Sequence, residues 1–211
     1  MRKNIAIFLN AVSLWQDRRF LWVLMAFVCV AFVCVSHLLF QRYGFMKPCE
    51  QCVYIRYAFL VMALGGIIAT LNPRNLALKI IAYILAFYGC IRGIAFSIKL
   101  NIIHRIAHSD ELVFGIQGCQ MEAKYDFGIP LDRWLPSLFK PTGECGFDYP
   151  VVSESVEGFR RAFVEFYADG WYLIPSMQFG NMAQCTLFAF AVCGVILAMM
   201  CVGFVHSLYR I

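Results

Sequence analysis

The sequence predicts an all-α membrane protein, a four-transmembrane-helix bundle with a long second segment on the outer side of the membrane. Hydrophobic residues make up 61% of the 211-residue chain, charged residues only 15%, and the mean hydropathy is +0.69. Soluble domains of this length are far less apolar. Four stretches are also close to the roughly 20 helical residues that cross a hydrocarbon core: residues 20–40, 53–71, 76–98 and 181–205.

The second and third predicted spans are joined by a short turn on the inner side. The first and fourth contain no Asp, Glu, Lys or Arg, whereas the second contains Arg56. The helix-breaking turn Asn72-Pro73-Arg74-Asn75 joins the second span to the third. These two spans are therefore expected to be antiparallel neighbours in an up-down bundle. The whole chain, residues 1–211, is expected to form a single integral membrane domain.

Basic residues predict the orientation, because Lys and Arg in short flanking segments stay on the cytoplasmic side. They gather before the first span, at the turn and at the chain end: Arg2, Lys3, Arg18, Arg19, Arg74, Lys79 and Arg210. Residues 101–180 instead hold 11 of the 13 acidic residues and 6 of the 18 Lys and Arg residues. Both termini are therefore expected inside, with residues 41–52 and 101–180 outside. The net charge of +5 reflects this topology, and no basic stripe with interleaved aromatic residues indicates nucleic acid.

The long outer segment carries two further patterns. Residues 129–136 mix prolines with apolar and aromatic side chains, which is typical of a piece lying at the membrane interface. Further on, Ser155 is a candidate helix cap, and the apolar residues after it fall on one helical face: Val156, Phe159, Phe163 and Phe166. This pattern fits either an amphipathic helix lying on the membrane surface or a small folded cap that packs on itself.

The ten cysteines divide by their predicted depth. Six occupy apolar positions in the spans, where free cysteine behaves as a small hydrophobic residue: Cys29, Cys34, Cys90, Cys185, Cys193 and Cys201. The other four lie at or beyond the outer boundary: Cys49, Cys52, Cys119 and Cys145. An even number of cysteines in an oxidising compartment predicts pairing.

The segment Cys49-Glu50-Gln51-Cys52 has the two-residue spacing that lets two sulfurs bond when the second cysteine starts a helix. Pro48 precedes it and the second span follows, so the thiols are expected at a helix N-terminus, where backbone N–H groups favour a thiolate. This placement favours a redox pair, with a metal site or a purely structural bridge as alternatives. A closed zinc site needs four ligands, and Cys119 and Cys145 have no adjacent His or Cys.

Arg56 lies one helical turn beyond Cys52. At that depth an unpaired guanidinium costs at least about 2.5 kcal/mol. An anionic partner is therefore expected, either a Cys52 thiolate or a ligand that gains negative charge on reduction. The alternative is an arginine that extends to the outer interface. Arg92 and His104 are weaker candidates for the same site, because Arg92 could bond helix carbonyls and His104 could be solvated.

Cys119 and Cys145 would close a loop of about 27 residues, which is worth roughly 3.5 kcal/mol on a chain-entropy estimate. Stability alone is a sufficient reason for such a bridge. Both cysteines lie beside glycines, namely Gly118, Gly143 and Gly146, in a segment expected to leave them accessible. An accessible disulfide can be attacked by an incoming thiolate.

The run Lys47-Pro48-Cys49-Glu50-Gln51-Cys52-Val53-Tyr54-Ile55-Arg56-Tyr57 strongly resembles the DsbB family of bacterial quinone-linked disulfide-generating proteins. Further matches fall in family order, so the likeness covers most of the chain: Arg92-Gly93, His104, residues 130–136 and Gly143-Glu144-Cys145. The Cys-Glu-Gln-Cys motif and the long stretch after Cys145 are similar to the DsbI branch of the family, which serves a thioredoxin-like partner, DsbL.

This resemblance implies a thiol:quinone oxidoreductase of the bacterial inner membrane, with both outer segments in the periplasm. A thioredoxin-fold partner, DsbL or DsbA-like, would attack the Cys119–Cys145 disulfide at Cys119, and electrons would pass to the Cys49–Cys52 pair. Cys52 would deliver them to ubiquinone or menaquinone. The resemblance implies that Arg56 stabilises the developing charge and that His104 borders the quinone, and it leaves the role of Arg92 open.

Two other functions stay open at this level. One is a membrane carrier that brings reducing equivalents from inside to outside. Such a carrier needs thiols that are reachable from the inner face, where Cys29, Cys34 and Cys201 form no close-spaced pair. The other is a metal-binding membrane scaffold without enzymatic activity.

Overall fold

The computed structural model describes residues 11–108, 119–152 and 156–209. It divides into two compact units. The first unit contains residues up to Ala31, with Ala58–Ile91 and the chain from Ala189 onward. The second contains Phe32–Tyr57 and Arg92–Phe188. Each long helix contributes residues to both units.

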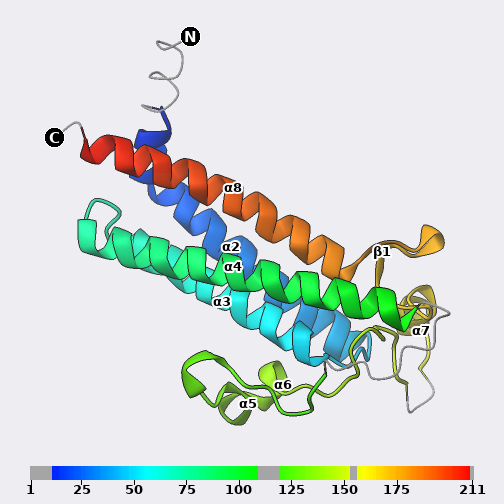
Figure 1. Ribbon diagram of the computed structural model, residues 1–211. Helices are drawn as coiled ribbons and strands as arrows, with labels where there is room; N and C mark the ends of the chain where they lie inside the picture. Colours follow the sequence, from blue (N-terminus) through cyan, green and yellow to red (C-terminus); the bar gives the residue numbers. More distant parts are fainter. Residues whose placement is uncertain (1–10, 109–118, 153–155, 210–211) are drawn as a thin grey trace. The chain divides into compact units, whose positions relative to one another are not determined.

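Four long helices occur where the sequence predicts membrane spans (Figure 1): α2 (Arg19–Cys34), continued by the π-helix η1 (Val35–Tyr43), then α3 (Glu50–Leu71), α4 (Leu76–Ala107) and α8 (Met182–Leu208). Each is long and apolar enough to cross a membrane. The predicted all-α, four-helix membrane class is therefore confirmed.

Three of the helices extend beyond the predicted spans at the ends that adjoin residues 41–52 and 101–180, whereas α8 extends past residue 205 to Leu208. The first continues to Tyr43 instead of ending near residue 40, and α4 continues to Ala107 instead of ending near residue 98. The second begins at Glu50 and not at Val53. Hydropathy marks only the stretch that suits hydrocarbon, whereas helical hydrogen bonds continue past that stretch. The redox motif and His104 therefore lie on helices.

Within the first unit all four helices pack together. Trp22 of α2 meets Tyr83 of α4 edge to face, with ring centroids 5.0 Å apart, and Phe59 of α3 stacks on Phe190 of α8 at 4.1 Å. A Cβ at Gly66 of α3 would lie 2.8 Å from the carbonyl oxygen of Trp22. Glycine is required there because a small residue lets two helix backbones approach.

The turn at residues 72–75 lies between the second and third long helices, as predicted. It lies between Leu71 and Leu76, and the Asn75 side chain caps α4 by accepting the N–H of Leu78 at 3.2 Å. Lys79 in the first turn of α4 donates to Asp17 at 2.5 Å. The six span cysteines are all free in the structure, as the sequence predicts: Cys29, Cys34, Cys90, Cys185, Cys193 and Cys201.

The long outer segment lies within the second unit and contains several short elements. In chain order they are η2 (Asp126–Gly128), α5 (Leu131–Trp134), α6 (Pro136–Phe139), α7 (Phe159–Phe166), β1 (Tyr172–Ile174), η3 (Pro175–Met177) and β2 (Phe179–Asn181). β1 and β2 form an antiparallel pair that the sequence pattern does not reveal. Three residues are too few to display the alternation that marks a strand.

Helix α7 packs on the first outer segment. The ring of Phe163 lies 5.5 Å from that of Tyr43 and 6.2 Å from that of Phe40, and Arg160 donates to the Tyr43 carbonyl at 2.9 Å. Phe159 and Phe166 of the predicted apolar face are exposed. Packing of Phe163 on residues 40 and 43 agrees with a folded cap, whereas the exposure of Phe159 and Phe166 agrees with a helix that lies on the membrane surface. Ser155, the expected helix cap, lies outside the described residues, and α7 begins after Gly158.

Candidate redox site

Cys49 and Cys52 form a disulfide in the first turn of α3, with their Cα atoms 5.0 Å apart. The Val53 N–H donates to the Cys49 carbonyl at 3.1 Å, and the Cys52 N–H donates to the Cys49 sulfur at 3.2 Å. Cys49 is fully buried and Cys52 is 7% exposed. This inner pair therefore lies at a helix N-terminus, as expected, and it is shielded from a bulky protein thiol.

Cys119 and Cys145 form the second disulfide, with their Cα atoms 5.8 Å apart. Cys119 is exposed, but Cys145 is only 5% exposed, so the expectation that both are accessible is wrong for Cys145. Its flanking glycines serve close packing: a Cβ at Gly143 would clash with the Lys47 carbonyl, and one at Gly146 would lie 2.7 Å from the Ala107 side chain. Of this outer pair, Cys119 is therefore the cysteine that solvent reaches.

Backbone hydrogen bonds attach the outer pair to the inner pair. The N–H groups of Thr142 and Gly143 both donate to the Pro48 carbonyl, at 2.9 and 3.0 Å. On the other side of the outer disulfide, the Gln120 N–H donates to the Glu50 carboxylate at 2.8 Å. The segments that carry Cys119 and Cys145 are therefore each hydrogen-bonded to residues 48–50, next to the inner pair.

Arg56 is 4% exposed, so it does not extend to the interface. Its Nε donates to the Ser36 hydroxyl at 2.9 Å, and its Nη1 donates to Gln41 Oε1 at 2.7 Å and to the Leu138 carbonyl at 3.2 Å. Neutral oxygens thus take the place of the expected anionic partner, and no ion pair to Arg56 is found among the residues that the structure describes. In this disulfide-bonded form its guanidinium is hydrogen-bonded to neutral oxygens.

The π-helix η1 explains how Ser36 and Gln41 reach the same guanidinium. In an α-helix of 3.6 residues per turn, residues five apart point to different sides. The hydrogen bonds of a π-helix join residues five apart, so these two side chains come to one side. Sequence reasoning missed both residues, because hydropathy does not distinguish the two helix types. The available signal was a group of polar residues, Ser36, His37 and Gln41, at the end of an apolar span.

Cys52 and Arg56 line the same small cavity of about 20 Å³. The other lining residues come from η1, the segment before α3, the loop after Cys145 and the start of α8: Ser36, Phe40, Gln41, Met46, Lys47, Pro48, Asp148 and Met182. The volume suits about one water molecule. A larger ligand therefore requires the lining side chains to move apart.

Asp148 is a lining residue that the sequence analysis missed. Burial raises the pKa of its carboxyl group to about 6, and the opposing effect of His108 is smaller. Nothing in the sequence around Asp148 marks it, since its position depends on the path of the loop that follows Cys145. The cavity beside Cys52 therefore contains a carboxyl group that titrates close to neutral pH.

Two other candidate side chains do not line this cavity. His104 lies 3.4 Å from the Asn181 amide and stacks on His108. Arg92 forms a two-pronged ion pair with Asp126, at 2.8 and 3.1 Å. The structure therefore gives Arg92 a partner in the long outer segment and leaves His104 close to the start of α8.

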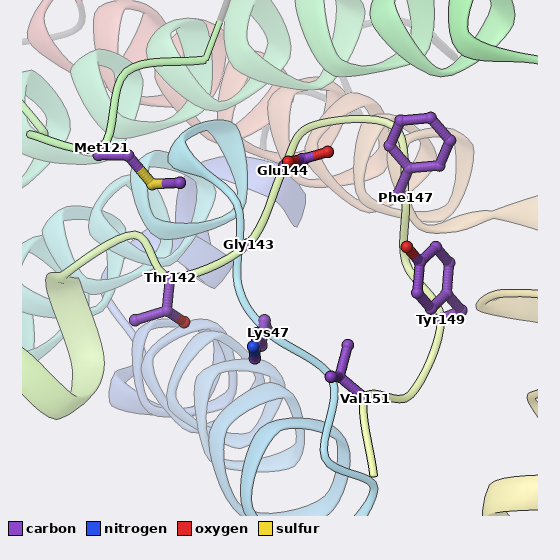
Figure 2. Close-up of a pocket in the computed structure, with 8 residues that line it drawn as sticks. All are labelled: Lys47, Met121, Thr142, Gly143, Glu144, Phe147, Tyr149 and Val151. Atoms are coloured by element: carbon purple, nitrogen blue, oxygen red, sulfur yellow. The ribbon is translucent and has the colours of Figure 1, made fainter. Parts of the chain in front are cut away.

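A groove of about 210 Å³ opens beside the outer disulfide (Figure 2). Figure 2 shows Phe147 and Tyr149 on one side of it and Met121 and Thr142 on the other. Glu144, which precedes Cys145, and Lys47 add one charge of each sign. Phe147 and Tyr149 are 39% and 49% exposed, so the groove presents apolar surface close to Cys145 along the chain.

Comparison with known proteins identifies related sequences over most of the chain. The family model described as "Disulfide bond formation protein DsbB" matches residues 18–200. A protein of Salmonella typhimurium named "Protein-disulfide oxidoreductase DsbI" is 48% identical over 192 residues, which cover 88% of this chain and 85% of that protein. The protein of that name from Escherichia coli O1:K1 is 47% identical over the same length, with 88% and 86% covered. A Campylobacter fetus relative that also carries the name DsbI is 50% identical over 204 residues, with 96% and 94% covered.

The family match extends over residues 18–200, most of the chain, and the four long helices agree with a membrane protein of this family. The resemblance first noted around Cys49-Glu50-Gln51-Cys52 is thereby confirmed. The chain belongs to the DsbB family of disulfide bond formation proteins, as a membrane-embedded protein-disulfide oxidoreductase.

Proposed function

We propose that this protein reoxidises a periplasmic thioredoxin-fold partner, DsbL or DsbA-like, and passes the electrons through its two cysteine pairs to membrane quinone. One observation carries the proposal. A disulfide that is exposed at Cys119 and buried at Cys145 is hydrogen-bonded through the segments at both of its ends to the residues around a buried disulfide. The exposed pair suits a protein thiol, and the buried pair, at the start of a membrane helix, suits an acceptor dissolved in the bilayer.

The exchange steps follow from thiol–disulfide chemistry. The partner's thiolate attacks Cys119, forms a mixed disulfide and releases Cys145 as a thiolate. The partner's second thiolate displaces Cys119, so the partner leaves oxidised. Cys145 then attacks Cys49 and releases Cys52, and Cys119 attacks Cys145 and releases Cys49. The outer disulfide is restored, and the inner pair holds both electrons as two thiols.

The cavity beside Cys52 fits a quinone in its chemistry, though its present volume requires movement. A bound ubiquinone or menaquinone supplies a two-electron, two-proton acceptor. Phe40, Met46 and Met182 provide apolar walls for a ring, and Arg56 provides N–H donors and a positive charge for an oxygen that gains negative charge. We place His104 at the border of this site, because its neighbour Asn181 precedes Met182.

We further propose that the partner approaches over the groove of Figure 2, because this groove adjoins Cys145 and offers apolar contacts. The orientation proposed is that of an inner-membrane domain spanning residues 1–211 with both termini in the cytoplasm. Residues 41–52 and 101–180 then lie in the periplasm. The excess of acidic residues in the second segment and of basic residues elsewhere supports this topology.

The test follows quinone absorbance while the purified full-length protein receives either a reduced thioredoxin-fold partner or a small dithiol. Cys49→Ala and Cys52→Ala are each expected to abolish quinone consumption without affecting membrane insertion. Cys119→Ala is expected to stop consumption driven by the partner and to preserve consumption driven by the small dithiol. Turnover retained in both inner-pair variants would rule out the relay, and a reductant carrier or a scaffold would show no partner-driven consumption at all.

A further inference from the structure

Glu50 is a buried carboxylate between the two cysteines of the inner pair, and the relay as proposed gives it no task. It is 7% exposed, and its Oε2 accepts the N–H of Gln120, the residue that directly follows Cys119. A carboxylate is costly to bury unless a donor satisfies it. Charge-assisted hydrogen bonds of this kind are also stronger than neutral ones. The contact is therefore a specific link between the two cysteine pairs.

The two ends of the outer disulfide are fastened in different ways. The Cys145 end is held by the bonds from Thr142 and Gly143 to the Pro48 carbonyl and by the close packing of Gly143 on Lys47. The Cys119 end is held by the charged acceptor Glu50.

A second contact continues the attachment of the Cys119 end. The Lys124 N–H donates to the Tyr54 hydroxyl at 2.8 Å. Glu50 and Tyr54 are one turn apart on α3. Their partners Gln120 and Lys124 are also four residues apart. Residues 120–124 therefore run along the first turn of α3. Of these two contacts, the one at Glu50 is the closer to Cys119 along the chain.

We infer that Glu50 is a positioning residue, which keeps Cys119 next to Cys145 and Cys49 while the bond between Cys119 and Cys145 is open. The inference rests on the proposed relay, in which that bond opens in every cycle. Once it opens, no disulfide joins the segment around Cys119 to the segment around Cys145. The bonds to Pro48 retain Cys145, and the bond to Glu50 retains Cys119.

This retention matters most in the last exchange step. Cys119 attacks Cys145 of the Cys49–Cys145 disulfide, the Cys119–Cys145 bond forms, and Cys49 leaves as a thiolate. The rate of this step and the stability of the product both depend on the effective concentration of Cys119 near Cys145. An anchor at the residue next to Cys119 raises that concentration without any contact to the reacting sulfurs.

The experiment measures the closing of the outer disulfide in the full-length protein with Cys49→Ala and Cys52→Ala, equilibrated in glutathione buffers and analysed by thiol alkylation. Glu50→Ala removes the acceptor, and Gln120→Pro removes the donor from the opposite side. Each is expected to lower the equilibrium constant for closing about tenfold, the effect of one charge-assisted hydrogen bond. Tenfold corresponds to a reduction potential about 30 mV less negative.

Matched variants separate this role from general damage. Gln120→Ala keeps the backbone N–H and is expected to stay within about twofold of the parent. Glu50→Gln keeps a side-chain oxygen acceptor but loses the charge, so its equilibrium constant is expected to fall by roughly threefold, between the parent and Glu50→Ala. Glu122→Ala removes an exposed carboxylate from the segment around Cys119 and controls for charge. If Glu50→Ala and Gln120→Pro also close like the parent, Glu50 has no positioning role. If Glu50→Ala does not fold, Gln120→Pro decides alone.

The glutathione measurement needs neither partner nor quinone, so its outcome is independent of the proposed function. In the chain with all four cysteines, Glu50→Ala is expected to slow quinone consumption driven by the partner by a larger factor than consumption driven by a small dithiol, which does not need the outer pair. Absence of partner-driven consumption in the wild-type protein would refute the relay and not the anchor.

Discussion

At the scale of single residues, Arg56 combines a buried charge with neutral partners. Four hydrogen bonds to Ser36, Gln41 and Leu138 hold it beside Cys52. An acceptor that becomes negatively charged would therefore gain from the nearby guanidinium. Arg56→Ala is expected to raise the apparent KM for quinone at least about tenfold. Steady-state kinetics with varied quinone measure this.

Arg92→Ala serves as the matched control for Arg56, since that arginine is paired with Asp126 and does not line the Cys52 cavity. Its expected quinone KM equals that of the wild type. An unchanged KM in Arg56→Ala would show that Arg56 links η1 to α3 by hydrogen bonds and does not take part in quinone binding.

Asp148 makes a prediction about pH. The pKa of its carboxyl is raised from 3.8 to about 6 by burial, so the folded protein prefers the neutral acid. The contribution of this neutral acid to the free energy of unfolding is complete below about pH 4 and is lost as the pH rises through about 6. Asp148→Asn is therefore expected to unfold at a higher Tm than the wild type at pH 7.5 and at the same Tm at pH 4. Thermal unfolding followed by circular dichroism tests this, and a difference that does not vary with pH would contradict it.

At the scale of elements, α7 is attached through the ring of Phe163 and through the hydrogen bonds of Arg160 to the Arg42 and Tyr43 carbonyls. Phe163 packs on Phe40, Tyr43 and Tyr167, whereas Phe159 on the same helix is 81% exposed. Phe163→Ala is expected to destabilise the cap by about 2–3 kcal/mol, somewhat less than for a fully buried ring. Limited proteolysis should then cut residues 156–170 faster than in the wild type. Phe159→Ala should be cut at the wild-type rate, and equal rates for all three proteins would show that α7 is not anchored through Phe163.

The helices could be predicted from sequence because apolar length alone determines them. The turn at residues 72–75 was equally clear, since Asn and Pro break helices locally. The π-helix η1 and the pair β1–β2 could not be predicted. The π-helix depends on a contact between Ser36 and Arg56, which lies 20 residues further along the chain. β1 and β2 form a local hairpin, but strands of three residues are too short to display an alternating pattern.

The candidate site could likewise be predicted only where a local sequence pattern encodes it. The pairing of Cys49 with Cys52 could be read from their spacing, and Arg56 from its depth in a span. The partners of Arg56, the burial of Cys145 and the bond from Gln120 to Glu50 arise from loop paths that no local pattern encodes. The glycines beside Cys145 illustrate this, because they suggested exposure and instead permit close packing.

At the scale of the whole molecule, the charge distribution predicts which loops face the periplasm. A membrane-impermeant maleimide added to intact spheroplasts should label Cys119 in a chain with Cys145→Ala, where this thiol is free. A cysteine introduced by Arg74→Cys in the inner turn, in a chain with the outer pair replaced by alanine, should react only after the membrane is permeabilised. The opposite labelling pattern would invert the topology.

The central claim is that electrons enter at Cys119 and not at the buried pair. The most direct measurement mixes the oxidised wild-type protein with a reduced thioredoxin-fold partner whose second active-site cysteine is replaced by alanine. The trapped mixed disulfide is then mapped by mass spectrometry. The partner should be attached to Cys119, with Cys145 recovered as a free thiol. Attachment to Cys49 or Cys52 would contradict the account.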